Sequence, residues 1–456
     1  MALSQQAADS TNAKTASFRP NVLFITIDTL RADHLSSYGY HLKTSPNIDR
    51  LASEGVRFER AHAVIPMTGP SHFSMFTGRF PQEHGARING VAVPIDSRWL
   101  TFPQVLRGLD YQSAAFVSAW PLKGRLTQLD QRFDSYDEEL TRSYQLLHSS
   151  RWAEDVAPSV ISWLNDGRDP NRPFLLWAHY FDPHSPNKLR QDYADLEQIG
   201  EPSEAVKRYD QAMAERVRRY DSEIGYVDEY IGKTLDTLDA LGLRDSTLVV
   251  LVSDHGESLG EHGYVGHGRR LTENTIRVPW VMRLPNRIPA GRVVSSNVSL
   301  LDLAPTLLGL AAPQTLADSE IGLDFSGRDL SRAALGEVEP PEQNVRYVAF
   351  GGKKGVAPAW ISWMWTSPVS NLPLLAGRTE GRRKFIWNPG DKAVQLFELD
   401  QDPGELDPAE LSENGSRDAD EHDRFLRWFQ STDLDDAEST MTERDIEALR
   451  SLGYLQ

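Results

Sequence analysis

The chain contains no cysteine among its 456 residues. This absence excludes disulfide bonds, thiolate metal ligands and a cysteine nucleophile. The chain also lacks any apolar run near the roughly 20 residues that a membrane-spanning helix needs, and its N-terminus, MALSQQAADSTNAKTASF, lacks the apolar core of a secretory signal. We therefore expect a soluble protein without a membrane span, cytoplasmic as given, or periplasmic or secreted if a signal was removed from a precursor.

Basic residues are in deficit. The 48 Lys and Arg residues face 65 Asp and Glu residues, which gives a formal net charge of -17. Such a balance argues against general binding to nucleic acids or to anionic membranes. A small anionic ester remains a plausible substrate, because a metal ion and a few Arg or His residues can form a local cationic pocket.

Short apolar runs separated by a helical segment indicate the fold class. The runs at 21–27, 174–178 and 247–252 are short enough for buried parallel strands, and residues 222–242 carry apolar residues at helical spacing. A strand, helix, strand order predicts a crossover connection. We expect an α/β fold with a large, mainly parallel sheet flanked by helices, and a smaller C-terminal α+β domain.

The length exceeds what one core usually holds, so we expect more than one domain. The predicted divisions are a polar tail at 1–20, a catalytic domain at 21–335 and a C-terminal subdomain at 336–456. Strand-like stretches such as RYVAF, KFIW and VQLFEL predict a small antiparallel sheet in that subdomain, and a terminal helix is predicted from Thr442.

Polar residues directly follow each of the three predicted strands. Asp28 follows the run at 21–27, His179 follows 174–178, and the pair Asp254 and His255 follows 247–252. Open α/β sheets bind their ligands at the carboxyl ends of their strands. The carboxylates and His255 are therefore candidate metal ligands, whereas we interpret His179 as a residue that organises the strand end.

Thr68 is a candidate nucleophile. It precedes Gly69 and Pro70, and Pro70 is well placed as an early residue of a helix. Thr68 would then lie at a helix N-terminus, where free N–H groups and the helix dipole favour an anion. On local sequence alone, a simple helix cap is the more economical interpretation.

Several motifs resemble the sulfatase branch of the alkaline-phosphatase superfamily. They span residues 21 to about 405 in the expected order: IDTLRAD (27–33), the TGPSH…TGR element (68–79), HYFDPHSP (179–186), SDHGESLGEHG (253–263), GHGRRLTENTIRVP (266–279), SLLDLAPTLLGLA (299–311) and LFELDQDPGE (396–405). The resemblance implies an ester hydrolase with a divalent metal ion.

The resemblance assigns the metal ligands and the nucleophile position by position. Asp28 matches the first metal-binding carboxylate, and Asp254 with His255 matches the late ligand pair. Thr29 stands where ordinary sulfatases have a second Asp, which puts a full calcium-type shell in doubt. One divalent ion is expected, and Mn, Zn and Ca all remain open, because calcium prefers oxygen ligands whereas a histidine suits zinc or manganese.

The resemblance also implies a set of polar residues around the transferred group. Asn89, His184 and His267 match such positions, with His184 or His267 as the acid that protonates the leaving group. His72 replaces the Arg that usually ends the nucleophile motif, and we include it among the catalytic candidates. His267 stands where many sulfatases have Lys.

Arginines are candidates for compensating the charge of the substrate. We name Arg79 and Arg269 as substrate-binding residues, with Arg87 as a further candidate. Most arginines in folded proteins lie on the surface, so the alternative for each of these residues is an exposed position without a role in binding.

Thr68 matches a position where sulfatases have a Cys or Ser oxidised to formylglycine. Oxidation of a threonine would give a ketone, so Thr68 is expected to act as an alkoxide. We expect Thr68 to be a ligand of the metal ion together with Asp28, Asp254 and His255, and this coordination would lower the pKa of its hydroxyl. Phosphate esters fit this chemistry better than sulfate esters, and we expect hydrolysis of a phosphodiester, a phosphonate monoester or a monoester through a covalent Thr68 intermediate. The alternatives are a sulfate ester hydrolase without formylglycine, a phosphotransferase to an alcohol and a non-catalytic binding protein.

Overall fold

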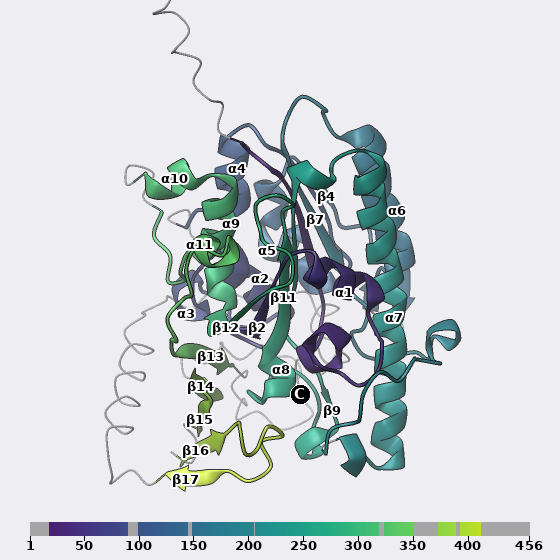
Figure 1. The fold of residues 1–456 in the computed structure, drawn as a ribbon, viewed down its shortest axis with the longest axis vertical. Helices are drawn as coiled ribbons and strands as arrows, with labels where there is room; N and C mark the ends of the chain where they lie inside the picture. Colours follow the sequence, from purple (N-terminus) through teal and green to yellow (C-terminus); the bar gives the residue numbers. More distant parts are fainter. Residues whose placement is uncertain are drawn as a thin grey trace, which may run out of the picture.

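The computed structural model describes residues 18–89, 99–144, 148–204, 206–318, 323–350, 373–388 and 393–411. An eight-stranded sheet forms the centre of the molecule (Figure 1). In spatial order its strands are β12 (Arg292–Ser299), β2 (Val56–His62), β11 (Arg277–Arg283), β8 (Thr247–Ser253), β1 (Asn21–Ile27), β7 (Phe174–Tyr180), β3 (Gln112–Phe116) and β4 (Ser135–Asp137). The three strands predicted at 21–27, 174–178 and 247–252 are confirmed as β1, β7 and β8.

The sheet is parallel except at one strand. β11 runs antiparallel to both β8 and β2, whereas the other pairs of neighbours are parallel. The register aligns Ile27 of β1 with Tyr180 of β7 and with Ser253 of β8. The residues that follow these strands, Asp28 and Asp254, therefore emerge at the same edge of the sheet.

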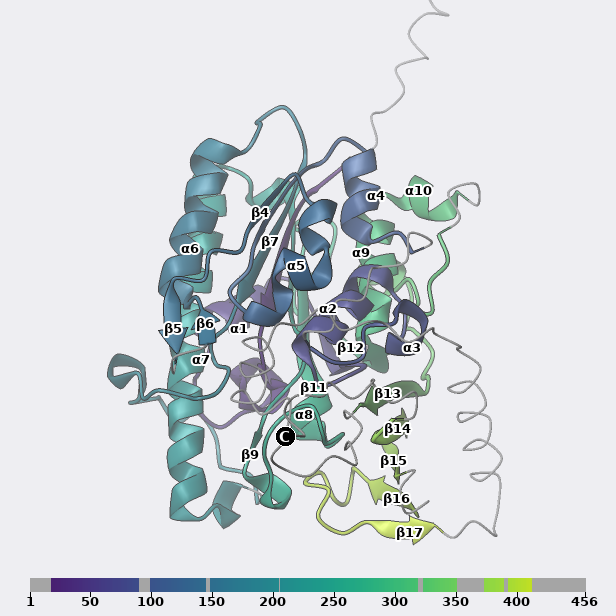
Figure 2. The same cartoon turned by 180° about the vertical axis from the view of Figure 1, so that it is seen from behind.

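Helices cover both faces of the sheet, as Figure 2 also shows from behind. Residues alternate along β1, so that Val22 and Phe24 face one helical layer while Leu23 and Ile25 face the other. The first layer holds α2 (Thr68–Thr77), α4 (Phe102–Gly108) and α9 (Leu303–Ala311), and the second holds α1 (Pro46–Ser53), α6 (Ala153–Ser162) and α7 (Gln211–Ala240). The predicted α/β class with a mainly parallel sheet between helices is confirmed.

Shorter elements complete the described part of the chain. The helices are α3 (Pro81–His84), α5 (Gly124–Thr127), α8 (Glu273–Ile276), α10 (Pro313–Ala317) and α11 (Ser331–Ala334), and the short strands are β5 (Arg142–Tyr144), β6 (His148–Ser150), β9 (Ser258–Leu259) and β10 (Val265–Gly266). Among the described residues, no helix combines the length and the apolar character that crossing a membrane would require.

A second, antiparallel sheet lies below the large one in Figure 1. Its strands, in order, are β13 (Val345–Ala349), β14 (Leu375–Glu380), β15 (Arg383–Asn388), β16 (Ala393–Glu398) and β17 (Ala409–Leu411). Val348 and Trp387 of this sheet pack against Ile65 and Met67, which directly precede α2. The predicted small sheet is confirmed, and the terminal helix predicted from Thr442 lies outside the described residues.

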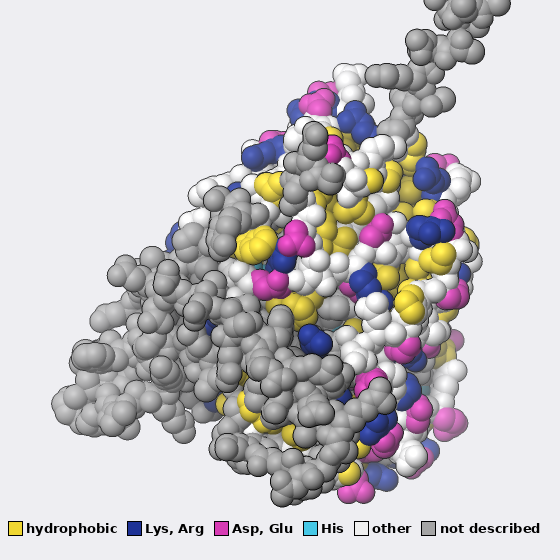
Figure 3. Space-filling view, turned by 90° about the vertical axis from the view of Figure 1, so that its left-hand side faces the viewer, with side chains coloured by type: hydrophobic (Ala, Val, Ile, Leu, Met, Phe, Trp, Pro, Cys, Tyr) yellow, Lys and Arg dark blue, Asp and Glu magenta, His cyan; other side chains and the backbone are white. Residues whose placement is uncertain are grey.

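Charges of both signs are interspersed on the side of the molecule drawn in Figure 3. Lys and Arg side chains alternate there with Asp and Glu over the described surface. The negative net charge is therefore not gathered into one acidic patch on the part of this face that the structure describes.

Candidate active site

The site begins at the carboxyl ends of β1 and β8, where two acidic side chains are buried side by side. Asp28 continues the parallel pairing, since its N–H donates to the carbonyl of Tyr180 at 2.9 Å. Thr29 then adopts a left-handed conformation with φ of 58°. For a β-branched residue this costs about 1–3 kcal/mol and needs support from its surroundings.

Two hydrogen bonds hold Thr29 in that conformation. Its N–H donates to Oδ1 of Asp254 at 3.2 Å, and its carbonyl accepts from the Tyr220 hydroxyl at 2.7 Å. The turn after β1 is thus tied to the turn after β8, which fixes the distance between the two carboxylates.

The orientation of Asp254 and His255 follows from their local hydrogen bonds. Oδ1 of Asp254 also accepts from the N–H of His255 at 2.9 Å, so Oδ2 is the oxygen that faces the site. Nδ1 of His255 lies 3.0 Å from the carbonyl of Gly256, and because a carbonyl only accepts, Nδ1 carries the proton. Nε2 of His255 therefore presents its lone pair, 3.8 Å from Oδ1 of Asp28 and 3.6 Å from Oδ2 of Asp254.

Thr68 is the first residue of α2, and its hydroxyl points into this cluster. Oγ1 of Thr68 lies 3.4 Å from Nε2 of His255. The N–H of Gly69 donates to Oδ1 of Asn89 at 2.7 Å, which fixes the first turn of α2. Both Thr68 and Asn89 are buried, and the hydrogen bond to Gly69 places Asn89 beside the residue that follows Thr68.

The residues present fit a divalent cation. Asp28, Asp254 and His255 each offer one ligand atom, and these atoms lie within 4.8 Å of one another. Oδ1 of Asp28 and Oδ2 of Asp254 are buried and accept no hydrogen bond from any described residue. Buried charges of one sign are costly without a counter-charge.

The pKa values of Asp28 and Asp254 also indicate that the two carboxylates need a counter-charge between them. Burial, with the neighbouring carboxylates of Asp254 and Glu257, raises the pKa of Asp28 well above its ordinary value. Burial likewise raises the pKa of Asp254. A divalent cation between them would favour the ionised form of both groups.

His72 lies one turn after Thr68 on α2 and contacts its carbonyl. A hydrogen-bond chain fixes its tautomer: Nε1 of Trp177 donates to Oγ1 of Thr26 at 2.8 Å, the Thr26 hydroxyl lies 3.2 Å from Nε2 of His72, and Nδ1 of His72 lies 2.8 Å from the carbonyl of Thr68. Both ring nitrogens of His72 are thereby engaged within the protein. The geometry is that of a residue that positions Thr68.

His184 and His267 form the opposite wall of the site. The ring centroid of His267 lies 4.4 Å from that of His255 and 5.0 Å from that of His184. Nδ1 of His267 lies 3.2 Å from Oε1 of Glu257, and Nδ1 of His184 donates to the carbonyl of Ser185 at 2.6 Å. Burial lowers the pKa of His267 to about 3, and burial together with the ring of His267 lowers that of His184 to about 3.

The family model for sulfatases, described as "Sulfatase", matches residues 20–313, which is more than half of the chain. The chain belongs to the sulfatase family. It is accordingly a hydrolase of sulfate or phosphate esters. The model covers Asp28, Thr68 and the histidines described above.

Curated relatives and solved structures agree with the family. An N-acetylglucosamine-6-O-sulfatase of Bacteroides thetaiotaomicron is 27% identical over 389 residues, covering 66% of this chain and 69% of that relative. A choline-sulfatase of Rhizobium meliloti is 25% identical over 456 residues, covering 87% and 83%. The crystal structure of a phosphonate monoester hydrolase of Agrobacterium radiobacter has a TM-score of 0.69 at 21% identity, covering 91% of this chain and 95% of that one, a likeness that concerns the fold.

The arginines of this sulfatase-family chain lie apart from the cluster or at its border. Arg79 follows the far end of α2, and its guanidinium pairs with Glu83 at 2.9 Å and with Asp324. Since α2 spans ten residues, or about 15 Å of helix, the structure does not bring Arg79 together with Thr68. Arg269 is half-buried two residues after His267.

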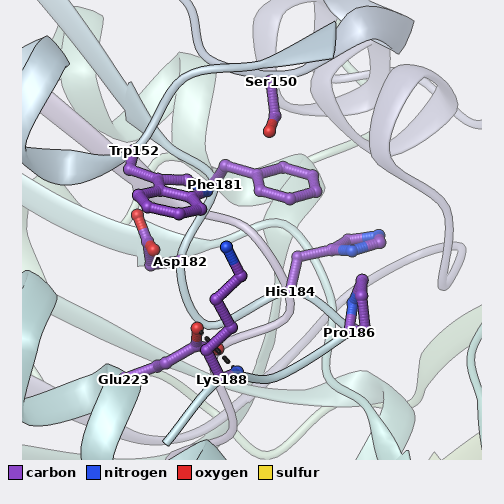
Figure 4. Close-up of a pocket in the computed structure, with 8 residues that line it drawn as sticks. All are labelled: Ser150, Trp152, Phe181, Asp182, His184, Pro186, Lys188 and Glu223. Carbon is purple, nitrogen blue, oxygen red and sulfur yellow. Dashed lines mark hydrogen bonds between the residues drawn. The ribbon is translucent and has the colours of Figure 1, made fainter. Parts of the chain in front are cut away.

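A small pocket is lined in part by His184. Figure 4 shows the ring of His184 beside Phe181 and directed away from Glu223 and Lys188. The acidic groups of the pocket are satisfied within the protein, because Asp182 accepts from Arg190 at 3.0 Å and Glu223 accepts from the N–H of Lys188 at 3.1 Å. These carboxylates hold the loop after β7 in place.

Two residues that contribute to the site were not predicted from the sequence. Glu257 is buried against His267, and Tyr220 of α7 supports the strained Thr29. Glu257 stands within the SDHGES motif, two residues after His255, and that spacing was an available signal. Nothing in the sequence singles out Tyr220, since its role depends on tertiary packing.

Proposed function

We propose that this chain hydrolyses phosphate esters through a covalent intermediate on Thr68. One observation carries the proposal: Oγ1 of Thr68 lies 3.4 Å from Nε2 of His255, beside two buried carboxylates. A threonine that only capped a helix would have no reason to face this cluster. Nucleophilic hydroxyls are activated by such surroundings.

The identity of the nucleophile favours phosphorus over sulfur. Threonine is a secondary alcohol, and its oxidation cannot produce the aldehyde from which formylglycine expels sulfate. A phosphothreonine, in contrast, is opened by attack of water on phosphorus. The names of the curated relatives favour sulfate esters, so sulfate ester hydrolysis is the second candidate.

Asp28, Asp254 and His255 would hold one divalent cation, which would lower the pKa of the Thr68 hydroxyl and stabilise the negative charge of the ester. Asn89 fixes the turn that carries Thr68, and its Nδ2 is buried without an acceptor among the described residues. That amide is suited to donate to an oxygen of the transferred group.

The bonds change in two steps. Oγ1 of Thr68 forms a bond to phosphorus as the bond from phosphorus to the leaving oxygen breaks. The Thr68 hydroxyl gives up its proton in this step, and we assign the transfer of that proton to the leaving oxygen to Nε2 of His267, because burial keeps this imidazole neutral beforehand and Glu257, 3.2 Å from its other nitrogen, would stabilise the imidazolium that forms. Water then attacks phosphorus as the bond from phosphorus to Oγ1 breaks, one proton of the water returns to Oγ1, and the phosphate or phosphonate product leaves.

Parallel assays on nitrophenyl phosphate, a phosphodiester, a phosphonate monoester and a sulfate ester, each with Mn, Zn and Ca, test the proposal. We expect activity on at least one phosphoester and a loss of about a hundredfold or more in Thr68→Ala. The matched control is Thr77→Ala, which removes a buried hydroxyl from the other end of α2. Activity on the sulfate ester alone, or a Thr68→Ala variant as active as Thr77→Ala, would overturn the proposal.

A further inference from the structure

His179 is the penultimate residue of β7 and is fully buried beside the carboxylate cluster. The sequence suggested that it organises the strand end. The contacts of His179 indicate a further role, because one of its two ring nitrogens faces the carboxylate of Asp28.

Ser118 determines the tautomer of His179. The Ser118 hydroxyl donates its single proton to the carbonyl of His179 at 2.7 Å, and the same oxygen lies 2.7 Å from Nδ1. Since that oxygen has no second proton to give, it accepts from Nδ1, which therefore carries the ring proton. Nε2 of His179 is left with a lone pair.

That lone pair faces acceptors. Nε2 of His179 lies 3.9 Å from Oδ2 of Asp28, and one ring nitrogen of His179 lies within 4.8 Å of a carboxylate oxygen of Asp254. A separation of 3.9 Å is too long for a hydrogen bond. Nε2 is buried and has no hydrogen-bond partner among the described residues. A lone pair opposite buried carboxylate oxygens is unfavourable unless a cation lies between them.

We propose that His179 is a further protein ligand of the cation, through Nε2, and that it completes a set of two carboxylates and two imidazoles. This inference rests on the cation site of the proposed function. Two metal–ligand bonds of about 2.1 Å span at most about 4.2 Å, so the 3.9 Å between Nε2 and Asp28 is within the reach of one ion. Asp28 would use Oδ1 on the side of His255 and Oδ2 on the side of His179.

His179 meets the usual requirement for a ligand histidine. Such residues donate their second ring N–H to an oxygen of the protein, as His179 does to Ser118 and His255 to Gly256. His72 is also near Asp254, with Nδ1 at 3.7 Å from Oδ2. That nitrogen already binds the carbonyl of Thr68, so His72 stays outside the ligand set.

The ligand set has a consequence for metal choice. Calcium prefers six to eight oxygen ligands, whereas imidazole nitrogens suit zinc and other transition metals. The second imidazole stands in for the carboxylate that Thr29 does not supply. The site should therefore prefer Zn²⁺ over Ca²⁺.

The test measures metal binding to the metal-free protein rather than activity. We expect His179→Ala to weaken Zn²⁺ binding by about tenfold to a hundredfold or more, as measured by competition with a chromophoric chelator, while Ca²⁺ binding by calorimetry changes far less. The control is His84→Asn, a buried histidine that bonds Ser74 in a different part of the fold. Equal Zn²⁺ affinity in wild type and His179→Ala would overturn the inference.

A spectroscopic count of nitrogens gives a second readout. With Cu²⁺ as the probe, pulsed electron paramagnetic resonance should detect two coordinated imidazoles in the wild type and one in His179→Ala, and a single imidazole in the wild type would overturn the inference. If His179→Ala does not fold, Ser118→Ala keeps the imidazole and removes its anchor, and we expect about tenfold weaker Zn²⁺ binding; unchanged binding in Ser118→Ala would count against the inference.

The outcomes separate this inference from the proposed function. Zn²⁺ binding through His179 without phosphoester hydrolysis would defeat the proposed function alone. Hydrolysis that depends on Thr68, with metal binding indifferent to His179 and Ser118, would defeat this inference alone.

Discussion

Replacing Lys384 with methionine should loosen the small antiparallel sheet from the catalytic part of the chain. Lys384 lies on β15 with no exposed surface, and its Nζ is 3.0 Å from Oε1 of Glu273 and 2.7 Å from Oε1 of Glu405. Glu273 begins α8, which follows the segment that carries His267. One buried cation thus joins the two parts.

The size of the effect follows from what remains after the substitution. Methionine fills much of the same volume but leaves the buried carboxylate of Glu405 and the half-buried carboxylate of Glu273 without their shared cation. Removing one partner from a buried ion pair costs about 3–5 kcal/mol. Burial already raises the pKa of Glu405 to about 7, so part of the cost will be relieved by protonation of that group. We expect a loss of about 3 kcal/mol in the free energy of unfolding.

Urea unfolding of the wild type and Lys384→Met measures this loss. Lys233→Met is the matched control, because Lys233 forms an exposed ion pair with Glu229 at 2.6 Å, worth about 0–1 kcal/mol. The double variant Lys384→Met with Glu405→Gln should recover part of the loss, since it removes one of the two carboxylates. Equal effects of Lys384→Met and Lys233→Met would refute the reasoning.

Two further predictions concern a glycine in the site and a histidine away from it. A Cβ on Gly256 would lie 2.1 Å from the carbonyl oxygen of Asn274, so Gly256→Ala should shift the turn that carries the proposed ligands Asp254 and His255 and weaken Zn²⁺ binding by more than about tenfold. The control is Gly108→Ala, whose added Cβ meets nothing within 4 Å and should leave Zn²⁺ binding unchanged. A chelator titration compares the two variants. Burial lowers the pKa of His84 from 6.5 to about 3. Below pH 6.5 the unfolded chain therefore binds a proton at His84 that the folded chain does not bind, and the free energy of unfolding decreases as the pH is lowered. Relative to His84→Asn, the wild type should lose about 2 kcal/mol between pH 7 and pH 5 in urea unfolding, and parallel pH profiles of the two proteins would contradict this.

The sequence predicted the strands that position the site but not the whole sheet. β1, β7 and β8 are continuous apolar runs because both of their faces are covered by helices. β2 and β11 were not predicted, since charged residues interrupt their sequences, VRFERAH and RVPWVMR. The first half of α7 was also missed, because its early turns are mostly polar and begin from the Asp210 cap.

The ligand candidates were predictable in type but not in orientation. Their position after strands predicted that Asp28 and Asp254 would meet, because parallel strands end at one edge of the sheet. The tautomers of His255 and His179 depend on Gly256 and Ser118, and for His179 that partner is distant in sequence. The sequence also suggested Arg79 as a residue that binds the anionic substrate. In the structure, packing on Trp99 and pairing with Glu83 hold Arg79 at the far end of α2.

The most direct measurement is to quench the protein with acid during turnover of a phosphoester and to map the modified peptide by mass spectrometry. We predict a phosphoryl group on Thr68 in the wild type and in Thr77→Ala, and none in Thr68→Ala. A phosphoryl group on any other residue, or turnover by an unmodified protein at a rate that Thr68→Ala retains, would contradict the central claim that the Thr68 hydroxyl is the nucleophile.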